Sequence, residues 1–85
     1  MFTIVIQDRA ERDLEKIPKN DQKKLLEKLF SDLPANPFPR GKNPKRLKGV
    51  PFYRWRYGDY RVIYQIIGNK VLILTIGHRK DVYRD

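Results

Sequence analysis

The stretch FYRWRYGDYRVIYQIIGNKVLILTIG, residues 52–77, decides the fold of this 85-residue chain. Its side chains alternate with a period of two, which is typical of β-strands. Gly58-Asp59 and Gly68-Asn69 interrupt the alternation with two short turn sequences. The stretch therefore predicts three antiparallel strands joined by tight hairpins.

The residues before this stretch predict one more strand and two helices. Residues 2–7 alternate and are rich in β-branched side chains, as in a strand. Apolar side chains then recur at helical spacing in two segments, the first starting near Asp8 as an N-cap, and Pro18 and Pro34 end them. The predicted order is β-α-α-β-β-β, an α+β fold whose antiparallel sheet carries a helical hairpin on one face.

Positive charge is concentrated in the second half of the chain. The formal net charge is +9, yet residues 1–32 hold seven basic and seven acidic residues. Residues 33–80 hold eleven basic residues and one acidic residue, Asp59. A charge that served only solubility would be spread evenly, whereas a confined excess attracts polyanions. The distribution predicts a surface that holds a nucleic-acid backbone.

Composition excludes several classes of protein. The chain has no cysteine and one histidine, so neither a disulfide nor a typical metal site is expected. It has no glycine-rich phosphate loop, and we expect no cofactor. The N-terminus does not resemble a signal peptide, and no apolar run reaches about 20 residues. We expect one cytoplasmic domain, residues 1–85, that does not enter a membrane.

Arginines are expected to gather on one face of the sheet. Alternation places Arg54 and Arg56 together, with Arg61 and Arg79 on the same side of the next two strands. The other face should be buried against the helices by Trp55, Val62, Tyr64, Leu72, Leu74 and Ile76. Any one of these arginines alone is best interpreted as a solvated strand residue. Four together, without neighbouring acids, favour a bound phosphate.

A proline-rich loop precedes the arginine strands, and it is also basic. We interpret it as a loop that flanks the working face and helps to bind RNA. Its proposed RNA-binding residues are Arg40, Lys42, Lys45, Arg46 and Lys48.

Two further residues are candidates for proton transfer. His78 stands at a strand end, where a lone histidine is often only a surface residue. Arg79 and Lys80 are expected to lower its pKa, which would suit a general acid or base. Tyr83, in the polar tail, is the best candidate for an exposed working tyrosine.

Short motifs along nearly the whole chain resemble the RelE family of toxin–antitoxin toxins. In order, they are Arg46-Leu47-Lys48-Gly49, Tyr53-Arg54-Trp55-Arg56, Gly58-Asp59-Tyr60-Arg61-Val62-Ile63-Tyr64, Gly77-His78-Arg79 and Val82-Tyr83. The resemblance implies a RelE-like fold, related to that of microbial ribonucleases. It also implies a toxin that enters the ribosomal A site, cleaves mRNA without a metal and so inhibits translation. A small acidic antitoxin would neutralise it.

By position, the resemblance implies catalytic roles for Arg54, Arg56, Arg61, Arg79 and Tyr83. The family often has lysine at the first two of these positions, and arginine does not lose its proton near neutral pH. Arg54 and Arg56 would therefore stabilise charge. The proton acceptor stays open between His78, Tyr83 and the ribosome itself.

Two other functions compete with mRNA cleavage. A ParE-like toxin would inhibit DNA gyrase and cut nothing, but that branch generally lacks the basic set together with a terminal tyrosine. A basic RNA-binding module without catalysis is the third possibility.

Overall fold

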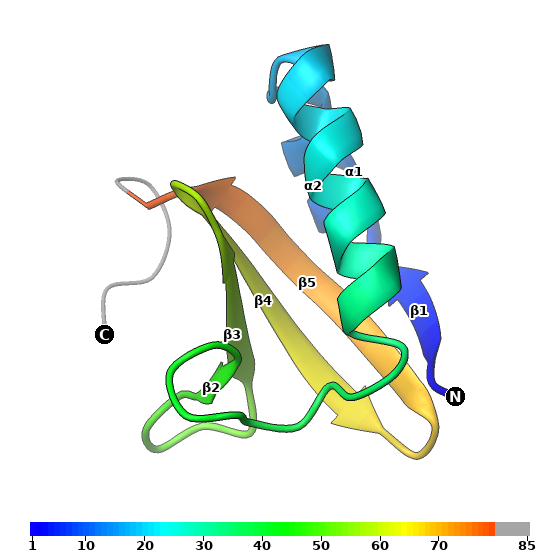
Figure 1. Cartoon of the computed structure of the whole chain (residues 1–85), viewed down its shortest axis with the longest axis vertical. Coiled ribbons are helices and arrows are strands. Elements are labelled where there is room, and N and C mark those ends of the chain that lie inside the picture. The colour runs from blue at the N-terminus through cyan, green and yellow to red at the C-terminus, as the bar shows by residue number, and fades with distance from the viewer. Residues whose placement is uncertain (80–85) are drawn as a thin grey trace.

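The computed structural model describes residues 1–79, and its elements follow the predicted order with one short strand added (Figure 1). The elements are β1 (Thr3–Ile6), α1 (Asp8–Glu15), α2 (Lys19–Asp32), β2 (Lys45–Arg46), β3 (Tyr53–Tyr57), β4 (Tyr60–Ile67) and β5 (Lys70–His78). Within the described residues, no helix is long and apolar enough to cross a membrane.

All five strands form one sheet in the order β1-β5-β4-β3-β2. The predicted meander is present, because β3 pairs antiparallel with β4 and β4 with β5. The first strand joins the same sheet, as expected, but it runs parallel to β5, so the sheet is mixed. The strand that was not predicted, β2, pairs antiparallel with β3 and forms the other edge.

The helices begin without side-chain caps. The first starts at Asp8 itself, with Gln7 at the N-cap, so the prediction of an Asp8 cap was wrong. Asp8 and Glu11 instead lie in the first turn, where their negative charge favours the positive end of the helix dipole. Pro18 separates the helices, since it is the N-cap of α2.

The core lies between the two helices and the sheet. Each helix contributes an apolar stripe, and the sheet contributes the largest buried side chains, Trp55 and Tyr64. The buried cluster consists of Ala10, Leu14, Ile17, Leu25, Leu29, Leu33, Trp55, Val62, Tyr64, Val71, Ile73 and Ile76.

One part of the predicted core was wrong. Leu72 and Leu74 are only half-buried, while Val71 and Ile73 are fully buried. The cause is an irregularity in the β4–β5 pairing: Ile63 pairs with Thr75 but Tyr64 pairs with Ile73, so Leu74 is an extra residue. An extra residue reverses the alternation on one side of it.

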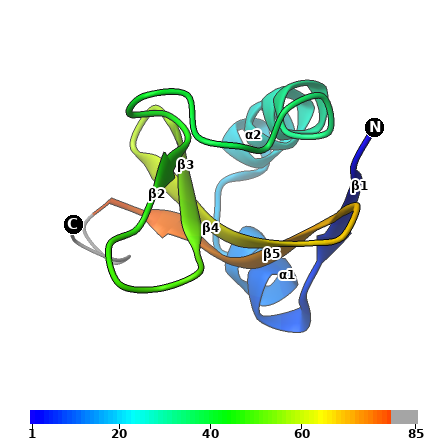
Figure 2. The ribbon, with the colours of Figure 1, turned by 90° about the horizontal axis from the view of Figure 1, so that it is seen from below.

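The loop between α2 and β2 is fixed to the core at two points. The buried Tyr64 hydroxyl donates a hydrogen bond of 2.6 Å to the Pro37 carbonyl. Asp32, at the end of α2, accepts hydrogen bonds from Trp55 Nε1 (2.8 Å) and from the Arg40 guanidinium (2.9 Å). Figure 2 shows the loop running from α2 across to β2 and β3. These bonds bring β2 against the edge of β3.

Candidate nucleic-acid interface

The four predicted arginines do lie on one face of the sheet. Arg56 is the direct cross-strand partner of Arg61, and Arg61 is paired on its other side with Gly77. Arg54 and Arg79 lie two residues from Arg56 and Gly77 respectively, so alternation puts them on the same face. We call this set, Arg54, Arg56, Arg61 and Arg79, the arginine face.

The closest pair on this face is Arg56 and Arg61. The Arg56 N–H and C=O both bond to Asn43, so they point away from β4. Arg56 and Arg61 are therefore a non-hydrogen-bonded pair, the kind in which side chains are closest, with Cα atoms about 4.5 Å apart. Arg56 is exposed and Arg61 half-buried. Like charges at such a position repel each other, and an anion between them would relieve the repulsion.

Arg54 differs from the other members because it is buried, at 7% exposure. Its cross-strand partner on β2 is Lys45. The Nη2 atom of Arg54 lies 3.4 Å from the Lys42 carbonyl oxygen. The expectation that all four arginines lie open to solvent was therefore wrong for Arg54. The added strand and the loop before it cover this residue, and its charge is held in place beneath the surface.

Arg79 has an acidic neighbour that was not expected. Its backbone N–H donates to the Asp59 carbonyl at 2.7 Å, and its Nε lies 3.7 Å from Asp59 Oδ1. Both side chains are more than half exposed, so this ion pair contributes little to stability. Asp59, the only acid between residues 33 and 80, thus lies beside the arginine face rather than away from it.

His78 lies on the other side of the sheet. It pairs with Tyr60, and the two rings meet edge to face at 6.0 Å between centroids. Both rings line a cavity of about 660 Å³ beneath the end of α1, together with Ile17 and Pro18. The structure therefore does not bring the imidazole into the arginine face.

Tyr60 itself is held in its protonated form. Its hydroxyl donates to Asp21 at 3.0 Å. Burial, and then this hydrogen bond, raises the pKa of Tyr60 above its usual value. Tyr83, the tyrosine that the sequence predicted to work at the site, lies outside the described residues.

The basic residues of this loop differ in their contacts and in their exposure. Arg40 is engaged with Asp32, at 2.9 Å, and so anchors the loop. Lys45 pairs with Arg54 and lies on the arginine face, whereas Arg46 pairs with Tyr53 and has the opposite orientation. Lys42 and Lys48 are exposed.

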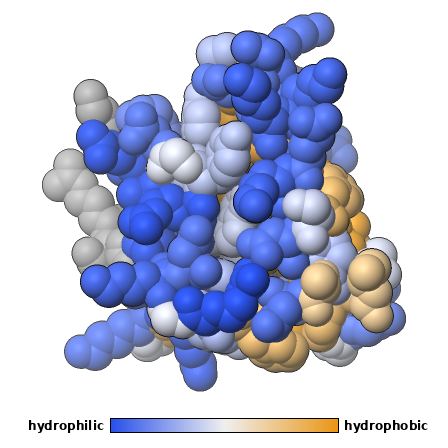
Figure 3. Space-filling view, in the orientation of Figure 1, coloured by the Kyte–Doolittle hydropathy of each residue, from blue (hydrophilic) through white to orange (hydrophobic). Residues whose placement is uncertain are grey.

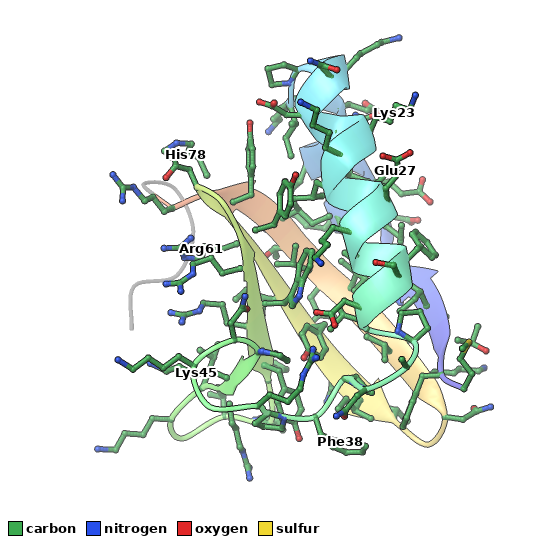
Figure 4. All side chains as sticks on the ribbon, viewed as in Figure 1. Lys23, Glu27, Phe38, Lys45, Arg61 and His78 are labelled. Atoms are coloured by element: carbon green, nitrogen blue, oxygen red, sulfur yellow. The ribbon has the colours of Figure 1, made fainter. Side chains whose placement is uncertain are left out.

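The figures show the same arrangement. In Figure 4, Arg61 and Lys45 project from the sheet away from α2, which carries Lys23 and Glu27. In Figure 3, hydrophilic residues cover most of the visible surface, and hydrophobic residues gather toward one lower corner. Among residues 1–79, the exposed large hydrophobic side chains are Met1, Phe30, Phe38 and Ile67.

One residue at this site was missed by the sequence analysis. Asn43 bonds to both backbone groups of Arg56, with its Oδ1 2.6 Å from the Arg56 nitrogen and its Nδ2 2.9 Å from the Arg56 oxygen. A loop asparagine gives no signal of such a partner thirteen residues away.

Comparison with known proteins identifies the family. Residues 4–83 match a family model, which is described as "ParE toxin of type II toxin-antitoxin system, parDE". Toxin RelG of Mycobacterium tuberculosis is 35% identical over 98% of this chain and 97% of its own length. The putative toxin RelE1 of Methanocaldococcus jannaschii is also 35% identical, over 99% of this chain and 97% of its own.

Solved structures agree with the sequence relatives. The toxin in the RelBE2 toxin–antitoxin complex from Mycobacterium tuberculosis superimposes with a TM-score of 0.78, at 32% identity, over 92% of this chain and 98% of that chain. Fold and relatives together define a toxin of the RelE/ParE superfamily of type II toxin–antitoxin systems. Within that superfamily, the chain belongs to the RelE family.

Proposed function

We propose that this toxin is a ribosome-dependent endoribonuclease that cleaves mRNA in the A site and so inhibits translation. The observation that carries the proposal is the cross-strand pair of Arg56 and Arg61, with Arg79 directly after the end of the next strand, β5. These three guanidiniums, two from neighbouring strands and one from the end of β5, would suit a phosphate and its developing charge. Family membership supports the same function.

In the proposed reaction, the ribose 2′-oxygen forms a bond to the adjacent phosphorus and the bond from phosphorus to the 5′-oxygen breaks. The products are a 2′,3′-cyclic phosphate and a 5′-hydroxyl. The attacking hydroxyl loses a proton and the leaving oxygen gains one. Arg56, Arg61 and Arg79 would stabilise the charge on the pentavalent phosphorus. They are not proton acceptors, because guanidinium stays protonated.

The proton acceptor is proposed to be Tyr83 or a group of the ribosome. The position of His78, on the helix side of the sheet and against Tyr60, argues against its contact with the same phosphate. Lys45, beside Arg54, is proposed to bind the neighbouring RNA backbone, with Lys42 and Lys48 at the exposed edge. The arginines need no metal or cofactor for these roles.

We further propose that a cognate antitoxin, a small acidic protein, binds this toxin. The solved structure from Mycobacterium tuberculosis is of a toxin–antitoxin complex, which supports a cognate antitoxin for this chain. An acidic partner would be attracted by the excess positive charge of residues 33–80. The ribosomal substrate would place the active toxin in the cytoplasm.

The second candidate is inhibition of DNA gyrase without cleavage. The description of the matching family model favours it. Translating ribosomes would be incubated with the purified protein, the mRNA ends mapped, and gyrase supercoiling assayed in parallel. We expect cuts within the A-site codon and unaffected supercoiling. Intact mRNA with inhibited supercoiling would support the gyrase function instead, and salt-sensitive RNA binding with neither effect would indicate a binding module.

A further inference from the structure

We propose that Asn43 is a positioning residue that fixes Arg56 in the arginine face. Its side-chain amide takes the place of a backbone peptide at the end of the β2–β3 ladder. In that ladder Lys45 pairs with Arg54 and Arg46 with Tyr53. Continuing the same register by two residues puts Asn43 opposite Arg56, where the two hydrogen bonds of 2.6 and 2.9 Å are found.

At this point the side chain of Asn43, and not its backbone, bonds to Arg56. The strand β2 begins only at Lys45, and the residue between them, Pro44, bonds within the loop, where its carbonyl oxygen accepts from the Arg40 N–H at 3.0 Å. A primary amide carries both a donor and an acceptor, so it can satisfy the Arg56 C=O and N–H together. Neither an apolar nor an acidic side chain could do both.

Arg56 depends on this contact more than a central strand residue would. Its N–H and C=O point toward Asn43, so it has no backbone hydrogen bond to β4 at this position. On the β4 side it faces Arg61, whose like charge pushes against it. The amide therefore holds the strand end against that repulsion and keeps the Cα–Cβ direction of Arg56 constant.

The loop before β2 contacts two arginines through adjacent residues. The Lys42 carbonyl lies 3.4 Å from Arg54 Nη2, and the Asn43 amide holds the Arg56 backbone. The sequence predicts that this loop helps to bind RNA through its basic side chains. Its backbone and its asparagine would, in addition, support the charges that the reaction would use.

This inference rests on the proposed function, and it is tested by a double-mutant cycle of Asn43→Ala and Arg56→Ala. Cleavage rate and ribosome affinity are measured separately on programmed ribosomes. Asn36→Ala is the matched control, because Asn36 is in the same loop and also accepts a backbone hydrogen bond, from Phe38, away from the arginine face. Asn43→Leu keeps a similar volume if the alanine variant is poorly folded.

We expect Asn43→Ala to slow cleavage about tenfold or more, with unchanged ribosome affinity, because small misplacements of a charge-stabilising group are costly. In the Arg56→Ala background, the same change should have no further effect. Asn36→Ala should cleave at the wild-type rate. If the losses in cleavage rate of the two single mutants multiply in the double mutant, the proposal is wrong. It is also wrong if both Asn43 variants cleave at the wild-type rate.

A second measurement is independent of cleavage. Amide hydrogen exchange on the wild-type protein should show a protected Arg56 N–H, and Asn43→Ala should remove that protection without affecting Val62. If wild-type protein cuts no mRNA, the proposed function fails, and the cycle is then measured as affinity for single-stranded RNA. An Arg56 amide that exchanges as fast as those of the exposed loop would overturn the role of Asn43 in either case.

Discussion

Arg56 and Arg61 face each other directly across the β3–β4 hairpin. Two guanidiniums in this position destabilise the hairpin that carries them. An anion between them would relieve this repulsion. Under the proposed function, the sheet would hold this charge in place before RNA binds, as a site that stabilises a phosphate in its transition state requires.

The first prediction concerns the salt dependence of RNA binding. For single strands, the logarithm of affinity falls with the logarithm of salt concentration by about 0.7 for each phosphate neutralised. Arg56→Ala should therefore reduce the slope by about 0.7, measured by titrating a non-cleavable RNA oligonucleotide. Arg12→Ala, an exposed arginine on α1, is the control of equal charge and should leave the slope almost unchanged. Equal effects of the two variants would argue against a local phosphate site.

The second prediction concerns the stability of the RNA-free protein. Replacing Arg56 by threonine removes the cross-strand repulsion and places a residue that favours strands. The free energy of unfolding should rise by about 0.2–1 kcal/mol at low salt. The gain should shrink in 1 M salt, which screens the repulsion. Denaturant unfolding at both salt concentrations measures it, and a less stable variant at low salt would contradict the repulsion.

Much of the fold could be predicted from sequence because periodicity and turn residues act locally. The meander, the helices and the first strand followed from such patterns. The parallel pairing of β1 with β5 and the short β2 did not, because they depend on long-range contacts. The extra residue Leu74, which reverses which side chains of β5 are buried, could not be foreseen either. All residues near it are apolar or β-branched, so the sequence itself does not mark the extra residue.

The site, like the fold, could be predicted only in part. Alternation correctly placed the four arginines on one face, because it depends only on strand geometry. It could not show that Arg54 is buried, that Asp59 approaches Arg79, or that His78 packs on Tyr60. Each of these depends on which residues the folded chain brings alongside.

The third prediction concerns the pH dependence of stability. Burial tends to raise the pKa of Asp32, but hydrogen bonds from Arg40 and Trp55 outweigh it, so the pKa lies below its usual value. Because the folded pKa is lower than the unfolded one, this carboxylate stabilises the protein above about pH 4. That contribution is lost as pH falls through the folded pKa.

Asp32→Asn should therefore lower the free energy of unfolding by about 1 kcal/mol at pH 7, because a charge-assisted hydrogen bond to Arg40 is lost. At a pH below the folded pKa of Asp32, the variant and the wild type should converge. Thermal or urea unfolding as a function of pH measures both. A difference that stays constant across this range would show that the carboxylate charge is not the cause.

The fourth prediction concerns the attachment of the loop. The Tyr64 hydroxyl is fully buried and donates to the Pro37 carbonyl at 2.6 Å. Tyr64→Phe would leave that carbonyl without its donor, which should cost about 1–3 kcal/mol. Urea unfolding tests it, with Tyr57→Phe as a control at a half-buried tyrosine. Equal stability of Tyr64→Phe and wild type would mean that the bond does not hold the loop.

The most direct test of the central claim is the rate at which Arg61→Ala cleaves mRNA on programmed ribosomes, compared with the wild type. If the arginine face stabilises the reacting phosphate, the rate should fall by about 10²–10³, the loss typical of removing one charge-stabilising donor. Arg12→Ala should cleave at the wild-type rate, and thermal unfolding should show both variants folded. Cleavage by folded Arg61→Ala at the wild-type rate would contradict the account.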